Sequence, residues 1–297
     1  PVLFLNPGIK EYVGEPDYET RWVGDPIIIS EWIRREPKYM GLRGGEHVVR
    51  DVFGPFSRLL FSAMKDAART HPPDAVSYHI GCFSAGWFAQ DAGIPSALIH
   101  LAPRTLLAKD DASVYPFPLR TAIRSLYPFA AKIFNRLVYP FARDCGVRRR
   151  PGLFLGAERY ANRTLALWAS TFRDRRASDP ERLVICGFPE CAAQTPLPEP
   201  VAGFLDSGDP PVAIGFGTSV ANLETPVIAR AVSAARSLGR RVLVIGGRAD
   251  AIPTDDSVHW TAQSPYDATF PRCAAIIHHG GIGTTAAALR SGHPSLI

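Results

Sequence analysis

The sequence has no apolar run that approaches the roughly 20 residues needed by a membrane-spanning helix. No secretory signal pattern is visible either, so we expect a cytoplasmic protein. The five cysteines are odd in number and lack the spacing of metal ligands, which favours free thiols in a reducing compartment. They are Cys82, Cys145, Cys186, Cys191 and Cys273.

Lysine is scarce, with five residues against 28 arginines. The formal net charge of +5 is spread along the chain, whereas a nucleic-acid-binding protein concentrates its positive charge on one face. We therefore expect no nucleic-acid partner. The sequence also lacks an acidic cluster that would suggest a metal site.

The length of 297 residues, with 46% hydrophobic residues, is enough for two globular domains. Short apolar runs alternate with amphipathic segments in two successive series, as in parallel sheets with right-handed crossovers. A proline-rich stretch separates the series. The sequence predicts an α/β protein with two Rossmann-like domains, at 1–188 and 204–297, and a linker at 189–203.

The two series predict the individual elements. In the first series we expect strands at 2–5, 74–79, 96–100, 165–168 and 183–186. We expect its helices to start at about 9–13 and to lie at 48–68 and 82–92. Pro55 should interrupt the helix at 48–68. In the second we expect strands at 212–216, 241–245, 258–260 and 274–277, and helices at 225–238, 268–272 and 284–289. His79 and His100 end two of these strands, where α/β sheets place ligands, although a hydrogen-bonded structural histidine is the favoured interpretation.

Residues 115–143 combine apolar positions at helical spacing with basic residues on the other faces, and Pro128 and Pro140 are expected to break the run. A packed core element or a pocket for an apolar acceptor is the favoured interpretation. Peripheral contact with an anionic membrane surface is the alternative.

The strongest motif follows the strand at 274–277. It reads His278-His279-Gly280-Gly281-Ile282-Gly283-Thr284-Thr285 and leads into a helix that ends before Gly292. A strand, a glycine turn and a helix N-terminus form an anion site, because free backbone N–H groups and the helix dipole both favour negative charge. The glycines, threonines and histidines together suit a diphosphate.

Two other interpretations stay open at this point. Gly281-x-Gly283-x-x-Ala286 matches a dinucleotide fingerprint, but the acidic residue expected about 20 positions later would lie beyond Ile297. A tight strand-to-helix turn with satisfied histidines is the structural interpretation.

The doubled histidine before the glycines resembles the donor signature of nucleotide-sugar-dependent glycosyltransferases of GT-B fold. Three further segments resemble that family in order: 183–189, 212–219 and 264–272. The resemblance implies metal-independent, inverting sugar transfer to a hydroxyl of an apolar small molecule, with no cofactor. It also implies a set of donor-binding residues, namely Gly217, Thr218, Gln263, Tyr266, His279, Gly281, Gly283 and Thr284.

The resemblance leaves several points open. Ala287 stands where related enzymes carry a ribose-binding glutamate, so UDP, dTDP and GDP all remain candidates. The resemblance implies a catalytic base before the position of Pro1, and whether residues are missing there, near 13–14 and after 297 stays open. A nucleotide-sugar epimerase and a non-catalytic, nucleotide-sugar-binding partner subunit are the alternative functions.

Overall fold

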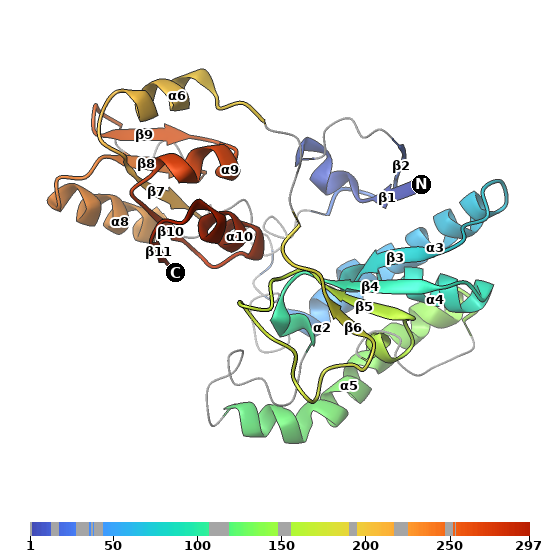
Figure 1. The fold of residues 1–297 in the computed structure, drawn as a ribbon. Helices are drawn as coiled ribbons and strands as arrows, with labels where there is room; N and C mark the ends of the chain where they lie inside the picture. The colour runs from blue at the N-terminus through green and yellow to red at the C-terminus, as the bar shows by residue number, and fades with distance from the viewer. Residues whose placement is uncertain are drawn as a thin grey trace. The chain divides into compact units, whose positions relative to one another are not determined.

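In a computed structural model of the chain, the described residues are 2–12, 18–27, 36, 38, 44–106, 119–147, 156–189, 195–216, 225–246, 252 and 254–297. The chain forms two compact units, Pro1–Gly187 and Phe188–Ile297 (Figure 1). Both are built on parallel strands, so the predicted α/β fold class is confirmed. None of the described helices is both long and apolar enough to cross a membrane.

The first unit contains two parallel sheets. One pairs β1 (Val2–Leu5) with β2 (Glu19–Trp22). The other has the order β3-β4-β5-β6, with strands Val76–His79, Ser96–His100, Arg163–Ala166 and Leu183–Ile185. Its helices are α2 (Gly44–Val48), α3 (Gly54–Ala68), α4 (Phe83–Ala92) and α5 (Leu119–Asp144).

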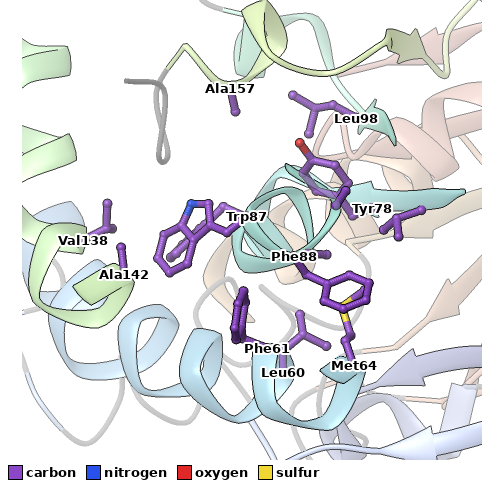
Figure 2. Packing of buried hydrophobic residues seen from close by; sticks show 14 of the residues in the cluster. Leu60, Phe61, Met64, Tyr78, Trp87, Phe88, Leu98, Val138, Ala142 and Ala157 are labelled. Carbon is purple, nitrogen blue, oxygen red and sulfur yellow. The ribbon is translucent and has the colours of Figure 1, made fainter. Parts of the chain in front are cut away.

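The core of this unit lies between its helices and its larger sheet. Helix α4 contacts β3 and β4, α3 packs on α4, and α5 packs on α3. Figure 2 shows Phe61 of α3, Trp87 of α4 and Val138 of α5 meeting in this core. Burial of such side chains stabilises each by about 1.5–3 kcal/mol relative to exposure, so α5 is held to the unit by its apolar side.

The exposed side of α5 carries Phe129 and Ile133 among the basic residues Lys132 and Arg136. The prediction that Pro128 and Pro140 break this segment was wrong, because α5 is one helix of 26 residues. Pro140 leaves the Arg136 carbonyl without its helical donor, and both residues lie on the exposed side of α5. Burial of Val138 and Ala142 holds the helix together around it.

The second unit contains one sheet with the order β11-β10-β7-β8-β9. Its strands are β7 (Val212–Gly215), β8 (Val242–Ile245), β9 (Val258–Thr261), β10 (Ala275–His278) and β11 (Ser295–Leu296). Side chains from α6 (Glu199–Asp206) and α10 (Ile282–Ser291) join one apolar cluster, and those from α8 (Thr225–Ser237) join another. Because β7 and β8 supply alternate residues to the two clusters, helices cover both faces of this sheet.

Several sequence expectations need correction at element boundaries. The predicted linker 189–203 overlaps α6, because Pro200 can occupy the first turn of a helix and Val201 is fully buried. The expected helix near 9–13 is a 3₁₀ turn at Pro7–Tyr12. The break at Pro55 is confirmed, since Val49–Phe53 forms a π-helical turn before α3 begins.

Replacing Gly54 with alanine should destabilise the first unit, because a Cβ there would overlap the Phe141 ring of α5. Overpacking of this kind costs about 1–3 kcal/mol. Urea unfolding measures the loss. Gly203→Ala in α6 is the matched control, since a Cβ at this helical glycine meets no described atom within 4 Å; it should be neutral or stabilising by up to about 1 kcal/mol. Equal effects of the two substitutions would contradict the assignment.

Candidate functional site

The sheet of the second unit has a topological switch point between β7 and β10. The first strand of the unit lies beside the fourth, and the helices that follow them, α8 and α10, cover opposite faces. Open α/β sheets bind ligands outside the carboxyl ends of such strands. Gly215 and His278, the last residues of β7 and β10, are register partners. The switch point therefore coincides with the signature found in the sequence.

The three glycines after β10 have three different roles. Gly280 has a φ of 81°, a left-handed conformation that favours glycine. Gly281 lies beneath the His279 ring, where an added Cβ would be 2.6 Å from Nε2. At Gly283 an added Cβ would meet no described atom within 4 Å and φ is not positive. Neither the backbone nor the surrounding protein requires glycine at 283, so the open space there is available to a ligand.

Helix α10 presents free backbone donors at the same place. Its N-cap is Gly281, which has no side chain to cap the helix. The first bond of the helix runs from the Thr285 N–H to the Gly281 carbonyl at 2.8 Å. The preceding N–H groups, of Ile282, Gly283 and Thr284, have no acceptor within the helix. Together with the helix dipole they form an anion site.

His278 is 2% exposed and braces the turn. Its Nδ1 accepts a hydrogen bond from the Gly280 N–H at 3.2 Å. The neutral ring therefore carries its proton on Nε2, and this buried nitrogen has no hydrogen-bond partner among the described residues. Burial, with a smaller contribution from His279, lowers the pKa of His278 and favours the neutral ring.

His279 lies closer to solvent than His278. Its ring stacks on Phe216, which follows β7, with 6.4 Å between centroids and an interplanar angle of 26°. Its buried Nδ1 has no hydrogen-bond partner among the described residues. Buried polar atoms are nearly always paired, so the unpaired ring nitrogens of His278 and His279 are available to a polar ligand or to water at this end of the sheet.

The remaining predicted donor residues fall into three groups. Gly217 and Thr218 lie outside the described residues. Gln263 is exposed in the segment before α9 (Tyr266–Thr269). Thr284 is buried in the first turn of α10, and Tyr266 begins α9 with its hydroxyl oxygen beside Gly215. The structure thus brings Tyr266, His279, Gly281, Gly283 and Thr284 together around the switch point.

Sequence reasoning missed two members of this site, Phe216 and Gly215. A Cβ at Gly215 would lie 3.2 Å from the Tyr266 hydroxyl oxygen. Gly215 and Phe216 lie at the end of a predicted strand, but Gly215 contacts Tyr266 and Phe216 contacts His279. These partners lie about 50 and 60 positions later in the chain. No local pattern reports such contacts.

The two histidines of the first unit do end strands β3 and β4. The His79 Nδ1 accepts from the Gly81 N–H at 3.2 Å. His100 is fully buried, and its Nδ1 lies 2.7 Å from the Thr105 hydroxyl, whose proton goes to the Ala102 carbonyl. Thr105 therefore accepts the bond from His100, which leaves the His100 Nε2 as a buried acceptor with no partner among the described residues.

A cavity of about 920 Å³ lies between β1 and β3 in the first unit. All four residues of each strand line it, with apolar side chains of α3 and α4 such as Met64 and Phe88. Among the described residues, β1 pairs only with β2 and β3 only with β4. The two strands therefore present unpaired edges to this cavity, and natural proteins cover or pair such edges.

This chain, with its two units built on parallel sheets, has the fold of GT-B glycosyltransferases. The crystal structure of the glycotransferase of kitacinnamycin matches 100% of this chain with a TM-score of 0.69 and 19% identity. The glycosyltransferase SsfS6 of Streptomyces sp. SF2575, complexed with thymidine diphosphate, matches 99% with a TM-score of 0.58 and 18% identity. The matches span 72% of each of those two chains.

Part of the sequence is also similar to glycosyltransferases of known name. The vancomycin aglycone glucosyltransferase of Amycolatopsis orientalis is 41% identical over 106 residues, which is 35% of this chain and 26% of that protein. No protein-family model matches the sequence. The chain thus spans about a quarter of the length of the curated relatives that it matches.

Lowering the pH should destabilise the first unit through His100. Burial, and secondarily His79, lower the pKa of His100 from 6.5 to about 4. Between these values the unfolded chain binds more protons, so the stabilisation is complete above pH 6.5 and is lost as the pH falls toward 4. The whole shift corresponds to about 3 kcal/mol.

His100→Asn tests this prediction, because its amide still offers Thr105 a donor but does not titrate. Urea unfolding at pH 7 and pH 4.5 should show a smaller loss of stability for the variant than for the wild type. An equal loss would contradict the assigned protonation state of His100.

Proposed function

We propose that the protein is a glycosyltransferase that moves a sugar from a nucleoside-diphosphate sugar to a hydroxyl group of an apolar small molecule. The observation that carries the proposal is the switch-point site, where free N–H groups of α10 adjoin unpaired nitrogens of two successive histidines. Sequence similarity to a named glucosyltransferase and fold similarity to a thymidine-diphosphate complex support it.

The proposed reaction is an inverting displacement. The acceptor oxygen bonds to the anomeric carbon of the sugar, and the bond from that carbon to the diphosphate oxygen breaks. The main electrostatic demand is the negative charge that develops on the departing diphosphate. Preorganised donors in a partly buried site meet such a demand without reorganising. We assign this role to the first turn of α10 and to His279, and no described residue is assigned as the base that takes the acceptor proton.

UDP, dTDP and GDP are all candidates for the nucleotide of the sugar donor. Ala287, at the position where related enzymes carry a ribose-binding glutamate, is buried in α10 and offers no acceptor to a ribose hydroxyl. Calorimetry with the three diphosphates tests the proposal and selects among them. Failure of all three to bind would refute it.

The acceptor is proposed to be an apolar natural product. The relatives include a vancomycin aglycone glucosyltransferase and an O-mycaminosyltylonolide 6-deoxyallosyltransferase of Streptomyces fradiae, 39% identical over 103 residues. A screen of aglycones with the selected donor, read by mass spectrometry, tests this point. A product larger than the aglycone by one sugar residue is expected. Conversion of the donor into another nucleotide sugar without any acceptor would indicate an epimerase.

Replacing His279 with alanine should weaken nucleoside-diphosphate binding by about 1.5–3 kcal/mol, the scale of a hydrogen bond to a charged group. His278→Asn is the matched variant, because its amide oxygen can accept the Gly280 N–H bond that holds the turn. Its effect should be smaller. Calorimetry measures both, and a greater loss for His278→Asn would show that the wrong histidine was assigned to the diphosphate.

Turnover of the nucleotide sugar should survive EDTA, because protein donors take the place that a cation would have beside the diphosphate. Among the described residues no group of three or more His, Cys, Asp or Glu side chains lies together as a metal site. Donor hydrolysis is measured before and after chelation. Activity that is lost and then restored by magnesium or manganese would contradict the metal-independent mechanism.

A further inference from the structure

Phe216 follows β7 directly and is anchored in the core of the second unit. It is 7% exposed and belongs to the apolar cluster on the α8 face of the sheet, together with Ile228 and Val232 of α8 and Val244 of β8. Close packing of this kind restricts a buried side chain to a single rotamer. The Phe216 ring therefore offers a fixed aromatic surface at the carboxyl end of β7.

The His279 ring contacts this aromatic surface and the glycine turn at the same time. Its plane is inclined by 26° to the Phe216 ring, and 6.4 Å separate the two centroids, a distance within the range of stacked aromatic pairs. The His279 Nε2 lies 2.6 Å from the position that a Cβ at Gly281 would take. The stack thus holds the ring in place, and the glycine at 281 leaves room for it there.

The orientation of an imidazole ring decides where a ligand atom can bind to it. A ring N–H lies in the plane of the ring, and a hydrogen bond weakens steeply when it departs from a straight N–H···O arrangement. A ring that could rotate freely would lose that freedom when a ligand binds, whereas a ring already fixed by the protein avoids this entropic cost. A side chain that fixes the His279 ring therefore contributes to binding without touching the ligand.

We propose that Phe216 is a positioning residue for the diphosphate: its ring holds the His279 imidazole at the angle at which a ring N–H donates to a phosphate oxygen. This inference rests on the proposed function of the site. It assigns a role to a residue outside the set of donor-binding residues that the family resemblance implies. It also links the core on the α8 face of the sheet to the signature that follows β10.

The first test compares two substitutions that differ in the aromatic face. Phe216→Met keeps an apolar side chain without a ring, and Phe216→Tyr keeps the ring. Calorimetry on the wild type with UDP, dTDP and GDP selects the nucleotide. Phe216→Met should then bind that diphosphate about 2- to 10-fold more weakly, on the scale of an aromatic pair, and Phe216→Tyr within about twofold of the wild type. Wild-type affinity in Phe216→Met, or equal losses in both variants, would overturn the inference.

Val232→Ala is the matched control for a loosened core. Val232 belongs to the same apolar cluster as Phe216 but lies on α8, so its truncation opens the core without removing the stacked ring. Thermal unfolding shows how far each variant is destabilised, and affinities are compared at a temperature at which all variants are folded. Val232→Ala should bind the diphosphate like the wild type. A loss as large as that of Phe216→Met would trace the effect to the core and overturn the inference.

A double-mutant cycle tests whether Phe216 acts through His279. If it does, Phe216→Met should cause no further loss of diphosphate affinity in the His279→Ala background, because the ring that it positions is already absent. Additive losses would overturn the inference, since the effects of independent sites add.

NMR spectroscopy follows the stack in the wild type without any substitution. Nuclear Overhauser contacts between the ring protons of Phe216 and His279 should be present in the free protein and persist when the selected diphosphate binds, while the His279 ring signals shift. Loss of these contacts in the complex would overturn the inference. Failure of the wild type to bind any of the three diphosphates would instead refute the proposed function, and the role of Phe216 with it.

Discussion

The parallel pairing of β7 and β10 is the constraint on which the candidate site depends. Their register places Gly215 beside His278 at one edge of the sheet, and the chain then leaves the two strands toward helices on opposite faces. Open α/β sheets bind ligands outside the carboxyl ends of strands that are arranged in this way. The core beneath, with Ile214 and Ile276 fully buried, fixes the strand positions, so the ligand-binding groups are placed by packing rather than by the turn alone.

The same local device occurs at a strand end in each unit. His79 and His278 each close a strand, and each ring accepts a hydrogen bond at Nδ1 from the N–H two residues later. The acceptor role fixes the neutral tautomer with its proton on Nε2. Burial lowers the pKa of both rings, which favours that neutral form. These hydrogen bonds brace the turn into α10 at His278 and the 3₁₀ turn before α4 at His79, and the Nε2 of His278 has no partner among the described residues.

Much of the fold could be predicted from the sequence because buried parallel strands appear as short apolar runs between amphipathic segments. The strands at Ser96–His100 and Val242–Ile245 lie where the pattern predicts them, within one residue. The pattern failed where tertiary contacts outweighed local propensity. Helix α5 continues through Pro140 because Val138 and Ala142 are buried against other helices, and α6 forms within a proline-rich stretch because Val201 joins a core.

For the site, the sequence indicated the signature but not the function of each residue in it. Three glycines in four positions look equivalent in sequence, yet one supplies a left-handed backbone, one makes room for the His279 ring, and one faces open space. Only the last leaves room for a ligand to approach the backbone. Tyr266 is also outside the signature, yet its hydroxyl oxygen lies 3.2 Å from where a Cβ at Gly215 would be, and its neighbour Asp267 forms an ion pair with Arg290 of α10. The candidate anion site therefore draws on three separate chain segments, namely the end of β7, α9 and the signature, and packing between these segments places its groups.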